Sequence, residues 1–419
     1  MSLFPDDPGH FVRWLERHEP GRPARRSVAD SYAPRLLYGR YVRDCLHQAI
    51  AEARSRVRVE VLEGTVTDLQ RSERGYLIRT ASGQHYQARA AALCLGNGQP
   101  DFPFDIHSIA AAAREHLIAD PWSDYRMRTI LPDQRVLFVG TGLTMVDQAL
   151  ALERAGHAGG LVAISRHGLP PAPHLPTRTE PCSIAIPRGK LTLQRLLRLV
   201  VEAARDEVAA GRDWRSVIDG LRPQTQELWQ RLDLEDRRRF FRHLAALWSV
   251  HRHRMAAEVA ERVERLRTDG RLTVAAGRVL TIRHAPGGVT VAFRRRGGPT
   301  VELLPFDWVV NCSGTGRASS GEAEPVLRQV LGLGLARAGF SGRGLDVEAD
   351  GAVIGRTGRP TAGLYGLGPL TVARFLEITA VPEIRLQCVT VAGALADFVA
   401  EGKRAVEFYR GRIASGSVR

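Results

Sequence analysis

The chain has 419 residues, which is enough for two domains with buried cores and excludes a small scaffold held together by disulfides or a metal ion. Its formal net charge of +14 raises the possibility of a nucleic-acid or anionic-membrane surface. Only Lys190 and Lys403 are lysines, however, and the arginines are spread along the whole chain without a recognition motif. We therefore expect no specific nucleic-acid partner.

The cysteines are widely spaced and form no CxxC pair or zinc-type cluster, so we expect no metal site and a reduced, cytoplasmic protein. The first eight residues contain two acids and two prolines, the opposite of a secretion signal. No stretch approaches the roughly 18 apolar residues of a membrane span. The sequence does not indicate an oligomeric state.

The first hundred residues change from a helical to a strand pattern. Periodicity predicts helices over 8–18 and 34–54. Short β segments are then predicted over 57–62, 65–70, 75–80 and 84–88. An apolar run, Ala90–Leu95, stops at Gly96-Asn97-Gly98 and predicts a buried strand that ends in a turn.

Residues 135–165 have the pattern of a βαβ unit, with a strand over 135–139, a helix over 143–155 and a second strand over 161–165. Gly140 permits a tight turn, and Gly142 lets the backbone approach a pyrophosphate at the start of the helix. Met145 replaces the third glycine of the usual fingerprint and should hold the helix slightly away from its strand. The unit predicts a dinucleotide ligand, with Thr141, Leu143 and Thr144 beside the two glycines.

The second strand of this unit ends in Ser165-Arg166 rather than in an acid. An acid there would bind the ribose 2′-OH of NAD, whereas Ser and Arg would bind a 2′-phosphate, so NADP(H) is predicted. Asp147 is either part of the cofactor site or an acid favoured by the helix dipole. The competing interpretation is that the two glycines only turn the chain and Arg166 is one more surface arginine.

Prolines cluster over 170–187, and a helical insertion is predicted over about 190–268. Strands follow over 272–275, 279–284 and 289–293, with Arg294–Arg296 as a solvated hairpin tip, and then a buried strand over 308–310. That strand ends in Asn311-Cys-Ser-Gly314, much as the earlier one ends at Asn97. The two asparagines mark either ligand sites or ordinary turns, because asparagine tolerates left-handed conformations.

His251 shares a helical face with Leu244, Leu247 and Trp248, a face that would otherwise be apolar. It is the best candidate for a catalytic side chain, and Arg254 could join it to bind an acidic substrate or a phosphate. A hydrogen-bonded core histidine is the alternative. Arg252 and His253 point elsewhere on the helix and are expected to be solvated.

Several segments together carry a resemblance to a known family. They are Pro34–Tyr41, Gly140–Asp147, Trp248–Arg254, Gly363–Thr371 and Glu377–Glu383. With them, the chain resembles the flavin-dependent two-dinucleotide oxidoreductases, and more closely the bacterial FAD/NAD(P)-binding proteins related to FAD-dependent urate hydroxylase and the aspartate N-hydroxylating monooxygenases. The resemblance covers essentially the full length.

The resemblance implies an α/β fold of two nested Rossmann-like, three-layer domains with a helical insertion. The FAD-binding domain would comprise 1–121 and 305–419, and the NADP(H)-binding domain 122–304. The implied FAD contacts are Arg35, Thr65 and Val66, the crossings at Gly96, Asn97, Asn311 and Gly314, and the turn formed by Gly368, Pro369, Leu370 and Thr371.

The sequence departs from this family at its beginning, because no strand with a GxGxxG turn occurs before Pro34. The first strand of such a fold lies in the middle of its sheet, so its absence would leave strand edges with unpaired N–H and C=O groups. Either the chain starts too late, with Met1 an internal methionine of a longer protein, or FAD binding is impaired.

The implied reaction begins with hydride transfer from NADPH to FAD. Reduced flavin would then hydroxylate a small polar substrate with oxygen, or pass its electrons to another acceptor. Two alternatives remain, an NADP(H)-binding redox sensor or inactive remnant without turnover, and a basic nucleic-acid binder.

Overall fold

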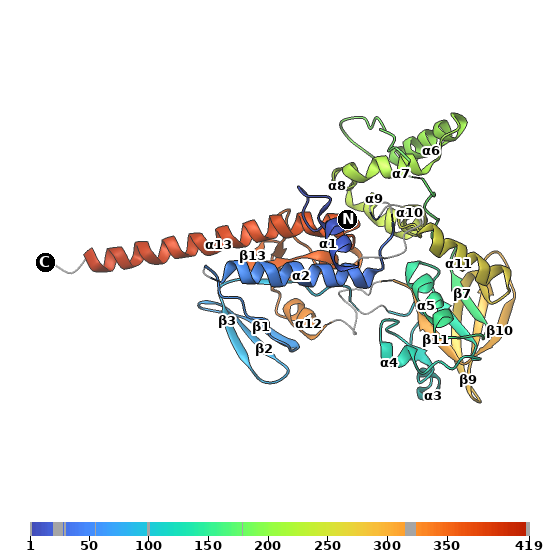
Figure 1. Ribbon diagram of the computed structural model, residues 1–419. Helices are drawn as coiled ribbons and strands as arrows, with labels where there is room; N and C mark the ends of the chain where they lie inside the picture. The colour runs from blue at the N-terminus through green and yellow to red at the C-terminus, as the bar shows by residue number, and fades with distance from the viewer. Residues whose placement is uncertain are drawn as a thin grey trace. The chain divides into compact units, whose positions relative to one another are not determined.

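The structure is a computed structural model that describes residues 2–19, 28, 31–54, 56–98, 101–177, 179–314 and 324–415. The chain forms two compact units, a terminal unit of Met1–Asn97 with Ala323–Arg419 and a central unit of Gly98–Glu322 (Figure 1). Among the helices of the described residues, none is long and apolar enough to cross a membrane.

The central unit is built on a seven-stranded sheet with the order β10-β9-β8-β7-β6-β11-β5. Its strands are β5 (Leu117–Ile118), β6 (Val136–Val139), β7 (Leu161–Ser165), β8 (Leu272–Ala285), β9 (Gly288–Arg295), β10 (Val301–Phe306) and β11 (Trp308–Asn311). Its helices are α3 (Ala111–Arg114), α4 (Asp124–Met127), α5 (Leu143–Arg154), α6 (Leu193–Ala209), α7 (Arg215–Leu221), η2 (Arg222–Gln224), α8 (Thr225–Arg231), α9 (Leu234–Arg239), η3 (Phe240–Leu244), α10 (Ala245–Arg252) and α11 (Ala257–Thr268). The predicted βαβ unit is confirmed as β6-α5-β7, with β6 and β7 parallel.

Strand β6 organises the core of this unit because all four of its side chains are buried. Val136 and Phe138 belong to one apolar cluster, which includes residues of α5 and α11. Leu137 and Val139 belong to a second cluster on the other face, with residues of the 102–113 segment and of β9. This alternation is the two-residue period of a strand that is covered on both faces.

The helix α5 packs on the sheet through Met145, which is fully buried among residues of β6 and β7. Val263 and Leu266 of α11 join the same cluster, so α11 covers the sheet as the crossover helix from β7 to β8. The predicted insertion over 190–268 is helical, but its last helix belongs to the layer that covers the sheet.

The central sheet extends beyond the range 122–304 predicted for the NADP(H) domain. β5 and β11 both lie outside that range, yet β11 is hydrogen-bonded in parallel between β5 and β6. The strands predicted over 272–275 and 279–284 form one strand, β8, with an irregularity between Val279 and Thr281. β10 was not predicted from the sequence. Its Pro305 is tolerated because β10 lies at the edge of the sheet.

The terminal unit contains two three-stranded sheets, β1-β2-β3 and β12-β13-β4. Its strands are β1 (Val66–Ser72), β2 (Gly75–Thr80), β3 (His85–Ala88), β4 (Ala91–Leu93), β12 (Ala352–Ile354) and β13 (Pro360–Gly366). Its helices are α1 (His10–His18), α2 (Arg35–Ala53), α12 (Pro325–Gly332), η4 (Phe340–Gly342), η5 (Gly368–Thr371) and α13 (Val381–Ser415). The predicted helices over 8–18 and 34–54 are confirmed, whereas 57–62 forms no strand and its valines are exposed.

β4 has a strand partner on one side alone among the described residues of the terminal unit. It runs parallel to β13, with Leu93 opposite Gly366, and lies at the end of its sheet. The N–H and C=O groups along the other edge of β4 therefore have no strand partner among the described residues.

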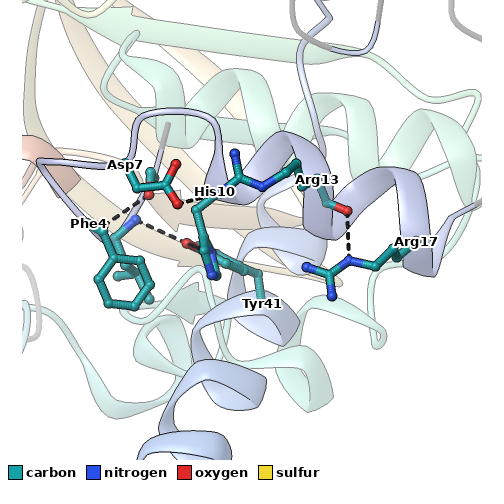
Figure 2. Close-up of polar contacts among 8 residues, drawn as sticks. Phe4, Asp7, His10, Arg13, Arg17 and Tyr41 are labelled. Atoms are coloured by element: carbon teal, nitrogen blue, oxygen red, sulfur yellow. Dashed lines mark hydrogen bonds and ion pairs between the residues drawn. The ribbon is translucent and has the colours of Figure 1, made fainter.

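Helices α1 and α2 pack together through an aromatic cluster around Tyr41, whose side chain is fully buried. The Tyr41 hydroxyl lies 2.8 Å from Nδ1 of His10 and accepts a hydrogen bond from the backbone N–H of Leu3 (Figure 2). An ion pair between Arg13 and Asp7 holds the start of α1.

In Figure 1, α13 runs beside β13 at its start and continues beyond the sheet of its own unit.

A cluster of charged side chains joins the helical insertion to the proline-rich segment around His174. The backbone N–H of His174 donates to the Met255 carbonyl at 2.7 Å, and Arg215 Nε donates to the Pro173 carbonyl at 2.9 Å. Burial, followed by the positive charge of Arg254, lowers the pKa of His174 from 6.5 to about 4. At pH 7 the imidazole of His174 is therefore neutral in the native protein.

We expect His174 to make the stability of the protein dependent on pH. Its native pKa of about 4 lies below its ordinary value of 6.5, so the contribution to stability is complete above pH 6.5 and is lost as pH falls toward 4. The free energy of unfolding should decrease by at most about 1.4 kcal/mol per pH unit in that window. Urea unfolding between pH 7 and pH 5 should show a smaller decrease for His174→Gln. His107→Gln, at an exposed position, should keep the wild-type slope, and equal slopes for all three proteins would contradict this assignment.

Candidate functional site

Gly140 is held between two strands at the carboxyl end of β6. Its φ is +121°, and a Cβ atom there would lie 2.1 Å from the carbonyl oxygen of Cys312, which follows β11. The Gly140 N–H donates to the Ile164 carbonyl at 2.8 Å, and the Cys312 N–H donates to the Val139 carbonyl at 2.8 Å. Both the backbone conformation and the close approach of a neighbouring backbone therefore require glycine.

At Gly142, neither the backbone conformation nor a close neighbouring backbone requires a glycine. It is the N-cap of α5 with φ −78° and ψ −170°, a conformation that any residue adopts. A Cβ atom at Gly142 would meet no atom within 4 Å, and the residue is exposed. Open space beside the first turn of α5 is what a ligand needs to approach the backbone N–H groups there, which have no side-chain cap.

The hydroxyl groups of Thr141 and Ser165 lie together, 2.9 Å apart, and connect the glycine turn to the end of β7. Thr141 Oγ1 also donates to the Leu169 carbonyl at 2.8 Å, and Ser165 Oγ accepts from the Gly168 N–H at 3.0 Å. These two predicted site residues therefore hold the turn in shape. Leu143 packs partly against the core, and Thr144 is partly exposed at the start of α5.

Asp147 lies on α5 close enough to Cys312 to affect its thiol. Burial and, after it, the negative charge of Asp147 raise the pKa of Cys312. The thiol is 5% exposed and stays protonated, so it acts as a small apolar group of the core. Whether Asp147 contacts a cofactor stays a prediction.

A cavity of about 360 Å³ begins immediately after Ser165, and we call it the basic cavity. It is lined by Arg166, His167, Arg242, His243, Gly277, Arg278, Arg294, Arg295, Arg296, Gly297 and Gly298. Arg296 Nη1 lies 2.9 Å from His167 Nδ1, and Arg295 pairs with Glu302. The side chains of the run Arg294–Arg296 are exposed, as predicted for a solvated hairpin tip, and they also line the cavity together with Arg166.

His251 and Arg254, the predicted catalytic pair, have separate partners in the structure. His251 Nδ1 lies 2.8 Å from the Leu247 carbonyl, and its ring meets Trp214 edge-on at 5.0 Å between centroids. The Arg254 side chain is 4% exposed and pairs with Asp219. These contacts support a hydrogen-bonded core histidine and a structural arginine, and the catalytic assignment stays a prediction. Arg252, expected to be solvated, is buried.

In the terminal unit, the turn over Gly368, Pro369, Leu370 and Thr371 forms the short helix η5. The Gly368 N–H, with φ +74°, donates to Gln387 Oε1 at 2.7 Å, and Gln387 Nε2 donates to Thr371 Oγ1 at 2.9 Å. Leu370 accepts a hydrogen bond from the Leu345 N–H at 2.7 Å. Gln387 was missed from the sequence, because nothing local distinguishes one glutamine of a long helix.

The remaining predicted FAD contacts of the terminal unit lie at the starts and ends of its elements. Arg35 is exposed at the first turn of α2, after Pro34. The Thr65 carbonyl accepts a hydrogen bond from the Ala81 N–H at 2.8 Å, and Val66 begins β1. Gly96 has φ +67° just beyond β4, followed by the exposed Asn97.

In the central unit, Asn311 is fully buried at the end of β11, and its Oδ1 accepts a hydrogen bond from the Ser313 N–H at 3.1 Å. Gly314 follows with φ +106°. This is the local turn chemistry that explains an asparagine without a ligand. Within the described ranges, no group of three or more His, Cys, Asp or Glu side chains could hold a metal ion.

Comparison with known proteins supports a dinucleotide-binding fold. A family model described as FAD-NAD(P)-binding matches residues 1–98. A comparison of the sequence with curated proteins gives no match.

Among solved structures, the reduced form of ornithine hydroxylase from Pseudomonas aeruginosa is similar with a TM-score of 0.59 and 15% identity, over 95% of this chain and 84% of that one. L-lysine 6-monooxygenase from Pseudomonas syringae has a TM-score of 0.58 and 16% identity, over 93% and 82%. An FAD-bound cadaverine monooxygenase from Erwinia amylovora has a TM-score of 0.51 and 12% identity, over 94% and 80%. These likenesses show that the chain has the fold of these flavin monooxygenases, and the family model matches the part of the chain over residues 1–98.

Proposed function

We propose that this chain is an NADPH-dependent flavoprotein oxidoreductase that binds NADP(H) on the β6-α5-β7 unit. The observation that carries the proposal is Gly142, a glycine that the fold itself does not require and that leaves the first turn of α5 open. A pyrophosphate there would accept hydrogen bonds from the free N–H groups and gain from the helix dipole.

The residues around the turn support the orientation of the dinucleotide. Gly140 is fixed by Cys312, and the Thr141 and Ser165 hydroxyls tie the turn to the end of β7. In a dinucleotide-binding unit the adenosine ribose lies beside the end of this second strand. Arg166 follows directly, so a 2′-phosphate at the ribose would meet a positive charge, which favours NADP(H) over NAD(H).

FAD, when bound, supplies an acceptor for the hydride of NADPH and a route from there to oxygen. The similarity in fold to an FAD-bound monooxygenase supports FAD as the second cofactor. We propose that Arg35, Thr65, Val66 and the η5 turn lie near it. Their role would be to bind and orient the flavin, and residues 2–98 offer no GxGxxG turn for its pyrophosphate.

We further propose hydroxylation of a small amine as the reaction. The similar structures include enzymes that, by name, act on ornithine, lysine and cadaverine. Such a reaction consumes NADPH, a proton and O2; one oxygen atom enters the substrate and the other leaves as water. A reductase would instead pass the two electrons of NADPH to oxygen, giving hydrogen peroxide, or to another acceptor.

A second candidate function is an NADP(H)-binding protein without turnover, such as a redox sensor. The observation that favours it is the terminal unit, where the Gly368 N–H is already bonded to Gln387 and β4 has an open edge. Both features would weaken the binding of FAD by the terminal unit. The two candidates differ in one measurable property, the reduction of bound flavin by NADPH.

We expect the purified chain, after incubation with FAD and gel filtration, to retain visible flavin bands that bleach when NADPH is added without oxygen. Under air, ornithine, lysine or cadaverine should increase NADPH consumption and yield a hydroxylamine, detected by mass spectrometry. NADPH consumption that yields only hydrogen peroxide would show that the flavin turns over but that none of these three amines is hydroxylated, which would contradict the proposed substrates. A colourless protein that consumes no NADPH with excess FAD would contradict the oxidoreductase and favour the second candidate.

The two glycines of the turn should respond differently to substitution by alanine. Gly142→Ala should leave the free energy of unfolding within about 0.5 kcal/mol of wild type, because its Cβ meets no atom. It should weaken binding of NADP⁺, measured by calorimetry, by roughly tenfold or more, about 1.4 kcal/mol, because the methyl group enters the space for the pyrophosphate. Gly140→Ala should lower the free energy of unfolding by about 2 kcal/mol or more.

Gly160→Ala is the matched control for Gly142→Ala. Gly160 is also exposed and its Cβ would also meet no atom within 4 Å, but it precedes β7, at the opposite end of the parallel strands. This variant should retain both stability and NADP⁺ affinity. Equal affinity in the Gly142 and Gly160 variants would overturn the assignment of the turn.

A further inference from the structure

The terminal unit contains a segment with the sequence of a strand but without a strand partner among the described residues. Residues 57–62, which we call the valine segment, read Val-Arg-Val-Glu-Val-Leu and connect α2 to β1. They form no helix, turn or sheet ladder. Apart from the Val57 N–H, their backbone groups make no hydrogen bond to another described residue. The backbone of the valine segment is therefore open to pairing with a second strand.

The side chains of the valine segment alternate between apolar and charged residues. Val57, Val59 and Val61 are 57%, 45% and 79% exposed. Arg58 and Glu60 form an ion pair with each other, so these two side chains lie on the same side of the chain, as they would in a strand. This period of two and the β-branched valines favour a strand, and the folded chain leaves both the valines and the backbone to solvent.

The sequence of the valine segment is complementary to itself in the antiparallel direction. If Val59 lies opposite the same residue of a second copy, Arg58 lies opposite the partner's Glu60 and Val57 lies opposite the partner's Val61. Every pair over 57–61 then joins two valines or two opposite charges, and both kinds of pair stabilise a sheet. A parallel pair in register would instead place like charges opposite each other. The charges therefore favour a second copy related by a twofold axis.

The ion pair within one chain does not prevent this arrangement. The side chains of Arg58 and Glu60 are 87% and 51% exposed, and an ion pair so exposed contributes little to stability. Association would replace it by ion pairs between the two copies and would pair the backbone groups of the valine segment. The valines of both copies would also lie side by side on one face and exclude water from one another. A short strand pair is smaller than most stable interfaces, so we expect a reversible dimer.

We propose that the valine segment is a self-association surface, through which two copies of this chain form an antiparallel strand pair. The strand that the sequence predicts over 57–62 would then form on association and not within a single chain. Each copy contributes the same surface to the contact, so the assembly closes at two copies. This inference requires neither FAD nor NADP(H), and its test is independent of the proposed redox reaction.

Sedimentation velocity of the full chain without cofactors tests the proposal. From roughly 1 to 100 μM, wild type should change from monomer to dimer. Arg58→Glu and Glu60→Arg each turn both cross-strand ion pairs into pairs of like charge, so each should weaken the dimer at least tenfold. The double variant, Arg58→Glu with Glu60→Arg, restores opposite charges in the same register and should dimerise like wild type.

A mixture of the two single variants gives a sharper test. In a heterodimer of Arg58→Glu with Glu60→Arg, one chain supplies acids at both positions and the other supplies arginines. Both cross-strand pairs then join opposite charges. The equimolar mixture should therefore dimerise at concentrations at which each variant alone is monomeric. An effect confined to the ion pair within one chain would give no such recovery.

Arg74→Glu is the matched control, because Arg74 is exposed at the turn between β1 and β2 and the substitution changes the net charge as Arg58→Glu does. It should dimerise like wild type, and thermal unfolding should show that all variants are folded. A wild type that stays monomeric over the whole range would overturn the proposal. A dimer that the single variants leave unchanged, or a mixture that does not recover, would also overturn it.

Hydrogen exchange locates the contact. Peptides that contain residues 57–62 should exchange more slowly at the concentration at which wild type is a dimer than at the concentration at which it is a monomer, because association pairs their N–H groups. The Arg58→Glu variant should show no such difference. Protection that appears elsewhere in the chain, with residues 57–62 unchanged, would contradict the assignment of this surface.

Discussion

The contact between the Gly140 backbone and the Cys312 carbonyl is the constraint on which the central site depends. It joins the carboxyl ends of β6 and β11, with no room for a Cβ atom between them. Because the chain must turn there, α5 begins at a fixed place above the sheet, and Met145 anchors it in the core. The free N–H groups of the helix, the Thr141–Ser165 contact and the start of the basic cavity all follow from this one turn.

The structure separates residues that packing and hydrogen bonds explain from residues that they leave unexplained, although the sequence presents them alike. Gly140 and Gly142 belong to the same motif, yet the first is explained by its neighbours and the second is not. Asn311 has a local turn partner, and Arg254 has Asp219. A functional role is best argued where packing, backbone conformation and hydrogen bonds leave a residue unexplained.

Much of the fold could be predicted from the sequence because its signals are local. The apolar strand β6, the glycine turn and the length of α5 lie within thirty residues, and the structure reproduces them. The errors have nonlocal causes. The edge strand β10 is recognised by its pairing with β9, and α11 by its contacts with α5 and β8. Gln387 meets Gly368 only in the folded chain. The basic cavity is the largest such case, because its walls come from three separate segments.

The distribution of charge likewise depends on which segments the fold brings together. The net charge of +14 is uninformative as a total, since arginines occur throughout the chain. Six of them line one cavity, where their exposed side chains create a positive local field that attracts anions. The ligand that we propose, NADP(H), is itself anionic at two points, a pyrophosphate and a 2′-phosphate. The helix N-terminus can serve the first with partial charges, whereas the second, a dianion in a partly open cavity, requires full charges on guanidinium groups.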